Sequence, residues 1–276
     1  MIGWLIYSAV DVEKNKYYIQ MYKDKFKEHF IEIKLVIVEE LENMEQYVKC
    51  NKVDFAINRS RNHIMGELLE QKGVRVFNSS SVTRIANNKG ITYEFLKDVV
   101  PFLAVKYGNE IIESKIENKG FEYPYVIKSC SGHGGSQVFF VNNSKEEEQA
   151  IKAMNGQEYV VQQCCSDLGR DVRVYIIGNK IIKAVLRTST ESFKSNYSLG
   201  GKVQEYTLNN EEKAMVERIV DKLPLDYAGI DFTFHNGKAV FNEIEDAVGA
   251  RMLYQVSDID IVEMYIKHIL EQLSKE

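Results

Sequence analysis

The chain has 276 residues, of which 45% are hydrophobic and 27% are charged, and its formal net charge is −5. This composition is typical of a globular protein, and the length predicts two or three domains. No block of Lys and Arg is present, so the charge pattern gives no indication of nucleic-acid binding. The apolar run at 2–10 is too short to span a membrane and, unlike a signal peptide, has no basic leader. Four cysteines without CxxC spacing favour a cytoplasmic protein without disulfides.

The first 89 residues alternate between runs typical of β-strands and runs typical of α-helices. Such alternation predicts a parallel α/β sheet. No GxGxxG motif follows the first strand, so a dinucleotide-binding site is not indicated there. Asn78-Ser-Ser-Ser81 is typical of a helix N-terminus, and we expect the helix that it begins to carry Lys89. The expected strands are 2–9, 33–38, 53–57 and 74–77, and the expected helices are 12–30, 42–50 and 62–72.

Two further segments are expected after this first domain. The central segment spans 90–160, and the C-terminal segment spans 161–276. The last helix begins with Asp260-Ile-Val-Glu263, a pattern typical of a capping box, so a structural role for Asp258 and Asp260 is preferred over metal binding. The expected strands are 102–107, 124–129, 137–141, 158–163, 171–177, 180–188 and 226–245, and the expected helices are 144–155, 210–223 and 258–274.

The hairpin expected at 227–245 carries acidic residues where a structural hairpin would carry β-branched or aromatic ones. Glu243 and Glu245 lie two residues apart, so on a strand their side chains point to the same face. Like charges about 4 Å apart repel by roughly 4 kcal/mol at an effective dielectric constant near 20. Together with Asp231, these carboxylates predict a site for Mg²⁺ or Mn²⁺. The alternative is a solvated acidic face on an edge hairpin.

The turn of this hairpin decides whether the three carboxylates share a site. A two-residue turn at Asn236-Gly237 would set Asp231 opposite Asn242 and send both glutamates to the other face. A shared site needs Asp231 opposite Glu243, and therefore one extra residue in the connection or in the strand. We expect a three-residue connection, with a β-bulge as the alternative, and all three carboxylates facing the 90–160 segment.

Lys128 ends an apolar strand, and the glycine-rich stretch Ser129-Cys-Ser-Gly-His-Gly-Gly-Ser136 follows it. Backbone N–H groups of such a loop can surround phosphate oxygens, and the lysine adds positive charge. The alternative is an ordinary turn between strands. Further along, Asp171 and Arg173 alternate with apolar residues and therefore share one face, which is usually the solvent-facing side of a sheet. A long polar loop at 188–201 follows, and loops of this length are often functional.

These motifs occur in an order that resembles the ATP-grasp superfamily and, within it, the branch of ribosomal-protein glutamate ligases. The order runs from Lys89 through the glycine loop and Asp-Val-Arg at 171–173 to Phe-Lys-Ser-Asn at 193–196, Gly-Ile-Asp and Asn-Glu-Ile-Glu. The resemblance covers 75–276 and implies a fold that is α/β and α+β. It implies an N-terminal parallel α/β domain (1–89), a small central lid (90–160) and a C-terminal, mainly antiparallel lobe (161–276).

The resemblance also implies roles for individual residues. ATP would lie between the central and C-terminal lobes, with two Mg²⁺ or Mn²⁺ ions held by Asp231, Glu243 and Glu245. Arg187 would lie near the transferred phosphoryl group, and Arg173 and Arg251 would contact substrate. The implied nucleotide contacts are Lys89, Lys128, Gly132, Gly134, Gly135, Gln163, Cys164, Cys165, Asp171, Lys194 and Asn196.

Two departures from the family pattern concern the end of the hairpin. The family usually has Asn at the position of Glu245, followed by a Pro-Gly loop, whereas this chain continues to Arg251 without proline. A differently shaped acceptor pocket is therefore expected. The implied reaction joins a small-molecule or peptide carboxylate to an amine through an acyl phosphate, at the expense of ATP. The alternatives are a non-catalytic nucleotide-binding sensor or scaffold, and an unrelated α/β protein with an acidic surface hairpin. The sequence leaves open both substrates and whether the chain forms a homo-oligomer.

Overall fold

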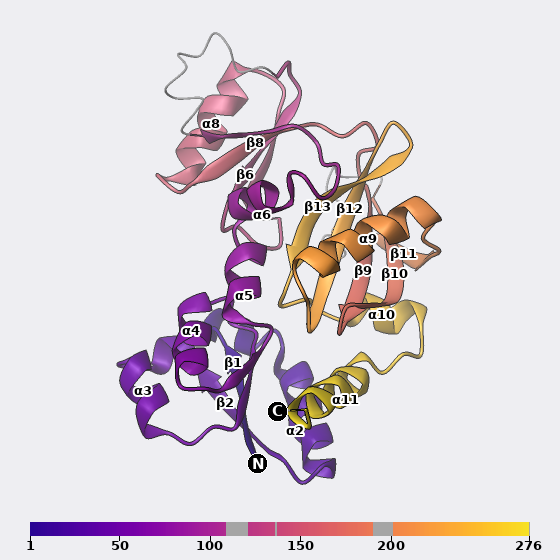
Figure 1. The fold of residues 1–276 in the computed structure, drawn as a ribbon. Helices are drawn as coiled ribbons and strands as arrows, with labels where there is room; N and C mark the ends of the chain where they lie inside the picture. The colour runs from indigo at the N-terminus through magenta and orange to yellow at the C-terminus, as the bar shows by residue number, and fades with distance from the viewer. Residues whose placement is uncertain (109–120, 136, 190–200, 276) are drawn as a thin grey trace.

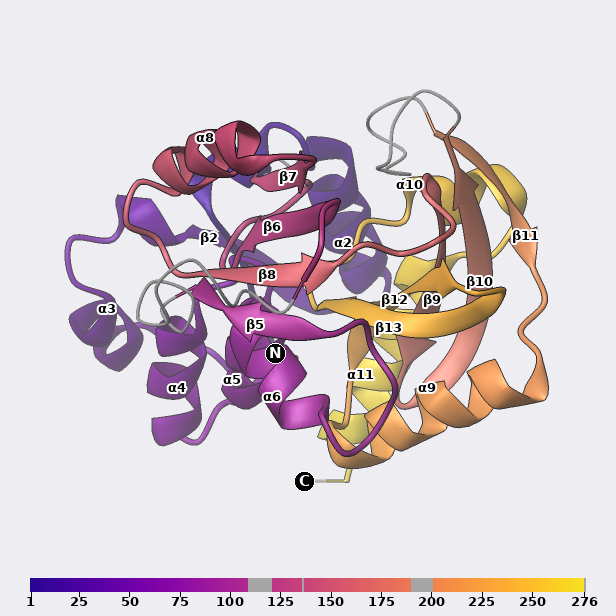
Figure 2. The same ribbon diagram turned by 90° about the horizontal axis from the view of Figure 1, so that it is seen from above.

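The computed structural model describes residues 1–108, 121–135, 137–189 and 201–275. These residues form three sheets, and each sheet is the centre of one lobe (Figure 1). The lobes follow one another along the chain as an N-terminal domain, a central lobe and a C-terminal lobe. They lie at the bottom, at the top and on the right of Figure 1, and Figure 2 shows the same arrangement from above.

The N-terminal domain has the strand order β2-β1-β3-β4, and every pair of neighbouring strands is parallel. This confirms the parallel α/β sheet predicted from the alternation of strands and helices. Successive side chains of β1 point to opposite faces, so Trp4 and Ile6 join one core while Leu5 and Tyr7 join another. The elements are β1 (Ile2–Tyr7), α1 (Ala9–Val12), α2 (Lys16–Glu28), β2 (Glu32–Ile37), the 3₁₀ helix η1 (Val38–Glu40), α3 (Met44–Cys50), β3 (Phe55–Asn58), α4 (His63–Gln71) and β4 (Arg75–Phe77).

The connection to the central lobe consists of two helices, α5 (Ser80–Ala86) and α6 (Lys89–Leu96), where the sequence predicts one. The break lies at Asn88, whose side chain accepts a hydrogen bond from the backbone N–H of Ile91 and so caps α6. Asparagine is among the best N-cap residues, which explains why a second helix begins here. Lys89 is consequently the first residue of α6 and lies next to the glycine loop.

The central lobe is an antiparallel sheet with the order β5-β8-β6-β7, and helix α8 packs on it (Figure 2). Its core joins Tyr125 and Ile127 of β6 to Ala150 and Met154 of α8. Because β8 pairs with β5 and β6, the domain boundary expected at 160 falls inside a strand of this sheet. The elements are β5 (Val105–Tyr107), β6 (Tyr125–Ser129), β7 (Val138–Val141), α8 (Ser144–Met154) and β8 (Tyr159–Gln163).

The C-terminal lobe is a five-stranded antiparallel sheet with the order β11-β10-β9-β12-β13. Asp260 accepts a hydrogen bond from the backbone N–H of Glu263, which confirms its structural role as the N-cap of α11. α11 also packs against the N-terminal domain, where Tyr265 meets Tyr22 of α2 (Figure 1). The elements are β9 (Arg170–Ile177), β10 (Lys180–Thr188), β11 (Lys202–Tyr206), α9 (Asn210–Lys222), β12 (Tyr227–His235), β13 (Lys238–Glu245), α10 (Arg251–Val256) and α11 (Ile261–Leu273).

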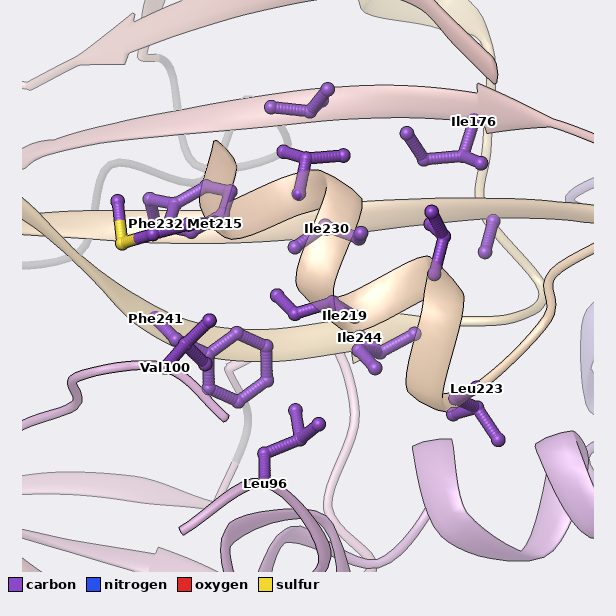
Figure 3. Packing of buried hydrophobic residues seen from close by; sticks show 14 of the residues in the cluster. Leu96, Val100, Ile176, Met215, Ile219, Leu223, Ile230, Phe232, Phe241 and Ile244 are labelled. Carbon is purple, nitrogen blue, oxygen red and sulfur yellow. The ribbon is translucent and has the colours of Figure 1, made fainter. Parts of the chain in front are cut away.

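Helix α9 covers one face of the C-terminal sheet (Figure 3). Met215 and Ile219 of α9 pack with Ile230, Phe232 and other apolar side chains of the strands in one buried cluster. Burial of each such side chain contributes roughly 1.5–3 kcal/mol. The opposite face of the sheet is therefore the one left for polar groups and for the N-terminal domain.

The hairpin of β12 and β13 has the register that a shared carboxylate site requires, with Asp231 opposite Glu243. The expected three-residue connection is wrong, because His235 pairs with Lys238 across a two-residue turn. Both turn residues have positive φ, 52° at Asn236 and 73° at Gly237, which Asn-Gly tolerates well. The extra residue lies instead in β13, where the pairing shifts next to Asp231, so the alternative expectation of a β-bulge is confirmed.

The β-bulge decides which side chains of β13 face inward. Phe241 and Ile244 both belong to the core beneath α9, although they are three residues apart. The two residues between them, Asn242 and Glu243, both line a cleft on the opposite side. A regular strand could not place two successive side chains on one face. The bulge thus brings a carboxylate and an amide to the cleft together.

Candidate functional site

A cleft lies between the central sheet and the C-terminal sheet, and we call it the interlobe cleft. All described members of the predicted nucleotide set line it, together with Glu243 of the predicted metal set. These residues are Lys89, Lys128, Gly132, Gly134, Gly135, Gln163, Cys164, Cys165, Asp171 and Glu243. The predicted contacts Lys194 and Asn196 lie outside the described residues.

The sequence analysis did not identify the apolar walls of the interlobe cleft, which include Leu103, Val126 and Val138. Two signals indicate part of this wall. Val126 lies two residues before Lys128 on the same strand, so the two side chains share a face. Val138 lies directly opposite Lys128 on β7. Apolar walls around a few polar groups suit a flat aromatic ring system.

Two lysines lie at one end of the interlobe cleft. Lys128 Nζ donates a hydrogen bond to Asn242 Oδ1 at 2.9 Å. Burial lowers the pKa of Lys128 to about 8; Glu243 opposes this shift and Lys89 adds to it. Lys89 Nζ donates to the carbonyl of Gly132 at 2.6 Å and lies 3.8 Å from Glu243 Oε2. Both ammonium groups therefore reach the same corner, beside the glycine loop.

The bulged residue Asn242 is held by a chain of hydrogen bonds from three other elements. Tyr93 of α6 donates its hydroxyl to the carbonyl of Asn242 at 2.8 Å. Gln162 of β8 donates in turn to the Tyr93 hydroxyl at 3.1 Å. With Lys128 bound to its side chain, the bulge is fixed by β8, α6 and β6 together.

The segment Gln163 to Cys165, which begins at the last residue of β8, forms another part of the lining of the interlobe cleft. The backbone N–H of Gln163 donates to the carbonyl of Ala104, which ties the segment to the strand region before β5. The neighbouring thiols of Cys164 and Cys165 also line the cleft. The hydrogen bond with Cys164 lowers the pKa of Cys165, although burial opposes the shift. A thiol with a lowered pKa is a reactive one.

Behind the interlobe cleft, Asp231 is fully buried at the centre of a charge network. Arg173 donates to its two carboxylate oxygens, each at 2.7 Å, and Arg187 donates to one of them at 2.6 Å. Arg173 also pairs with Glu245 at 2.6 Å, and Arg187 pairs with Asp171. The expectation that Asp171 and Arg173 share a face is confirmed, but this face is buried rather than exposed to solvent.

The three predicted metal ligands differ in how exposed their carboxylates are and in how far arginines already occupy them. Both oxygens of Asp231 are engaged by arginines, and the described residues contain no group of three or more His, Cys, Asp and Glu that could hold a metal ion. The side chains of Glu243 and Glu245 are 31% and 30% exposed. Accessible carboxylates suit Mg²⁺, which also takes waters and phosphate oxygens as ligands. Glu243 and Glu245 therefore fit such an ion better than Asp231 does, although Glu245 also pairs with Arg173.

A second space, which we call the charged cavity, lies between the N-terminal domain and the C-terminal lobe. It shares Gly134, Gly135 and Glu243 with the interlobe cleft, so the two spaces adjoin. The predicted residues Arg173, Arg187, Glu245 and Arg251 line it. Residues of the N-terminal domain line it too and were not identified from the sequence, because only tertiary packing brings them here. They are Asp11, Lys14, Asn15, Tyr17, Tyr18, Met21 and Arg61.

Comparisons with known proteins agree with this architecture. The family model of a RimK-like ATP-grasp domain matches residues 94–269. The Uncharacterized protein MG011 of Mycoplasma genitalium is 32% identical over 96% of this chain and 91% of its own length. The chain belongs to the RimK-like ATP-grasp family.

Two further RimK-like ATP-grasp relatives bear on fold and function. A probable alpha-L-glutamate ligase of Haemophilus ducreyi is 26% identical over 72% of this chain and 67% of its own length. The RimK domain ATP-grasp protein of Sphaerobacter thermophilus superposes with a TM-score of 0.77 at 19% identity, covering 97% of this chain and 99% of that one. The resemblance stated from the sequence and the expected mixture of α/β and α+β structure are therefore confirmed. The ATP-grasp family is one of ATP-dependent ligases that use ATP with Mg²⁺.

At the end of the hairpin, the chain still differs from the usual family pattern, with Glu245 in place of Asn and no Pro-Gly loop before Arg251. Glu245 pairs with Arg173, and Arg251 is the exposed first residue of α10 at the edge of the charged cavity.

In the part of the chain that the structure describes, no helix has the length and apolarity needed to cross a membrane.

Proposed function

We propose that this RimK-like ATP-grasp protein is an ATP-dependent carboxylate–amine ligase that forms an amide or peptide bond through an acyl phosphate. The observation that best supports the proposal is that the interlobe cleft and the charged cavity adjoin each other. The interlobe cleft and the charged cavity meet at Gly134, Gly135 and Glu243, so a phosphate in the first would lie beside a carboxylate in the second. Holding two reactants side by side is a large part of what a ligase must do.

The lining of the interlobe cleft supports its assignment to ATP. We place the adenine between the apolar walls and the segment Gln163 to Cys165, and the phosphates at Lys89, Lys128 and the glycine loop. Two ammonium groups in a partly buried corner offset phosphate charge more strongly than they would in water. In this proposal the central lobe acts as a lid over the nucleotide.

The carboxylates define where Mg²⁺ would bind. We propose Glu243 and Glu245 as its ligands, completed by phosphate oxygens and water, and we retain two ions as the prediction. When bound, Mg²⁺ would neutralise phosphate charge and orient the phosphates. Asp231 would then act mainly by holding Arg173 and Arg187 in place, because both of its oxygens already accept from them.

The charged cavity supports the chemistry of the acceptor side. A substrate carboxylate there would attack the γ-phosphorus of ATP, breaking the bond to the bridging oxygen and releasing ADP. An amine would then attack the acyl phosphate carbon, lose a proton and displace inorganic phosphate. Arg187, which lines the cavity and is held by two carboxylates, would stabilise negative charge on the transferred group. We propose Arg173 and Arg251 as further substrate contacts, and small-molecule or peptide carboxylates and amines as substrates.

One observation favours the alternative of a non-catalytic nucleotide-binding protein. Both carboxylate oxygens of Asp231, a predicted metal ligand, already accept hydrogen bonds from arginines, so this carboxylate is paired without an ion. A sensor or scaffold would bind Mg-ATP without turnover. A ligase would turn over ATP continuously and form a condensed product only when both a carboxylate and an amine are present.

An ADP-release screen tests the proposal. Purified protein with Mg-ATP is incubated with pairs of amino acids, small carboxylic acids and peptides, and products are identified by mass spectrometry. We expect at least one pair to give ADP, phosphate and a condensed product. Replacing Arg187 by Met should reduce the rate by about 100–1,000-fold. The matched control is Arg218→Met on the exposed surface of α9. Tight Mg-ATP binding with no product from any pair would favour the sensor.

A further inference from the structure

Arg59 follows β3 of the N-terminal domain and is buried, with 4% of its surface exposed. Its Nε donates to the hydroxyl of Tyr7 at 2.9 Å. The rings of Tyr7, Tyr18 and Tyr227 lie 5.8, 5.2 and 5.8 Å from its guanidinium carbon. Among the described residues, no carboxylate pairs with it. A buried guanidinium needs other partners to offset its desolvation.

Those partners are two backbone carbonyls of the C-terminal lobe. Arg59 Nη2 donates to the carbonyl of Ala247 at 3.1 Å and to the carbonyl of Val248 at 2.7 Å. These residues belong to the segment 246–250, which directly follows Glu245 and contributes Ala247, Gly249 and Ala250 to the lining of the charged cavity. The guanidinium therefore lies behind this lining and binds it from the side of the N-terminal domain.

The neighbouring carbonyls of this segment are also bound by side chains. Asn78 donates to the carbonyl of Asp246 at 3.4 Å, and the hydroxyl of Tyr175 donates to that of Gly249 at 3.0 Å. Every carbonyl from 246 to 249 thus accepts from a side chain, and Arg59 supplies two of the four bonds. Segment 246–250 contains no proline to restrict its backbone. These tertiary hydrogen bonds, together with burial of the Val248 side chain, therefore hold its shape.

We propose that Arg59 is a positioning residue through which the N-terminal domain sets the shape of segment 246–250 and the place of Glu245. The planar guanidinium suits this task, because one nitrogen can donate to two successive carbonyls while another binds Tyr7. A lysine would keep the charge among the tyrosine rings but lose this geometry. The role of Glu245 in the proposal rests on the proposed function, whereas the shaping of the segment does not.

Hydrogen exchange measured by mass spectrometry tests the shaping of the segment. In Arg59→Met, we expect the backbone amides of 246–250 to exchange about tenfold faster or more, with β12 little changed. Arg59→Lys should show the same change and serves if Arg59→Met fails to fold. The matched control is Arg75→Met, since Arg75 also reaches from the N-terminal domain to the C-terminal lobe, where it pairs with Asp226 at 3.1 Å. Equal exchange of 246–250 in wild type and both Arg59 variants would overturn the proposal.

Calorimetry with a non-hydrolysable ATP analogue separates positioning from a general loss of structure. Mg²⁺ should increase the affinity of the protein for the analogue. In Arg59→Lys and Arg59→Met, we expect the Mg²⁺ concentration that gives half of this increase to rise about tenfold. The affinity measured without Mg²⁺ should not change. Arg75→Met should behave as wild type. An unchanged Mg²⁺ requirement in both Arg59 variants would overturn the link to Glu245. If wild type binds no nucleotide, the proposed function fails, and hydrogen exchange still decides the role of Arg59.

Discussion

Arg173 lies directly opposite Asp231 on the neighbouring strand and donates to both oxygens of its carboxylate, each at 2.7 Å. Burial alone would raise the pKa of Asp231, but Arg173 and Arg187 outweigh burial and lower the pKa to about 2. The carboxylate is therefore ionised at neutral pH, although it has no exposed surface. A buried charge of this kind organises the groups around it and is costly to remove.

Replacement of Asp231 by Asn is expected to destabilise the protein by about 3–5 kcal/mol, because it leaves two buried arginines without their shared anion. Urea denaturation followed by circular dichroism measures this difference. Asp221→Asn on the exposed side of α9 is the control and should stay within about 0.5 kcal/mol of wild type. A loss at position 231 no larger than at 221 would contradict the central role of the carboxylate.

The pKa of Asp231 also predicts a pH dependence. Its folded value of about 2 lies below the ordinary value of 3.8, so its contribution is fully present above about pH 4 and is lost as pH falls toward 2. The stability difference between wild type and Asp231→Asn should therefore shrink across this window. Unfolding free energies measured at several pH values from 2 to 5 check the prediction. A difference that stays constant over the window would show that another group is responsible.

Replacement of Lys128 by Ala is expected to weaken ATP binding without unfolding the protein. Loss of one charge-assisted contact typically costs about 1.5–3 kcal/mol, or roughly 10- to 150-fold in Kd. Isothermal titration calorimetry measures the Kd. The control is Lys238→Ala at the exposed start of β13, which should bind as wild type does. An unchanged Kd in Lys128→Ala would contradict the proposal that Lys128 contacts the phosphates of ATP.

The lowered pKa of Lys128 predicts that nucleotide affinity falls in mild alkali. With a pKa of about 8, the ammonium is charged below pH 8 and loses its proton as pH rises through this value. The Kd for the ATP analogue should then increase by up to about tenfold per pH unit between pH 8 and 9. Lys128→Arg should abolish this slope, because arginine remains charged. Parallel slopes in wild type and Lys128→Arg would assign the effect to a different group.

Nucleotide should protect Cys165 from alkylation if the adenine lies beside it. The lowered pKa of this thiol favours reaction with N-ethylmaleimide, and the thiol lines the interlobe cleft. Peptide mass spectrometry should show slower labelling of Cys165 when Mg-ATP is saturating. Cys50 is exposed in the N-terminal domain and provides an internal control, since its labelling should not change. Equal labelling of Cys165 with and without nucleotide would show that the adenine does not bind beside this thiol.

Much of the site follows from patterns within single elements. Residues two apart on a strand share a face, so the common orientation of Asp171 and Arg173 follows from the sequence alone. The glycine loop after Lys128 and the capping residue Asp260 are likewise local signals, and each lies where it is expected. Motif order then indicates the family, and the match of the family model to residues 94–269 confirms it.

Other features depend on partners that are far away in the chain. The bulge at Asn242 is held by Tyr93, Lys128 and, through Tyr93, Gln162, so the hairpin sequence alone could not distinguish it from a longer turn. Asp231 meets Arg173 and Arg187 because β9 pairs with β12 and β10 pairs with the other edge of β9. Arg59 reaches the segment behind the site from a different domain. Side-chain periodicity is a local property of the sequence, whereas the choice of neighbouring strands and domains is made by long-range packing, and only the tertiary structure shows it.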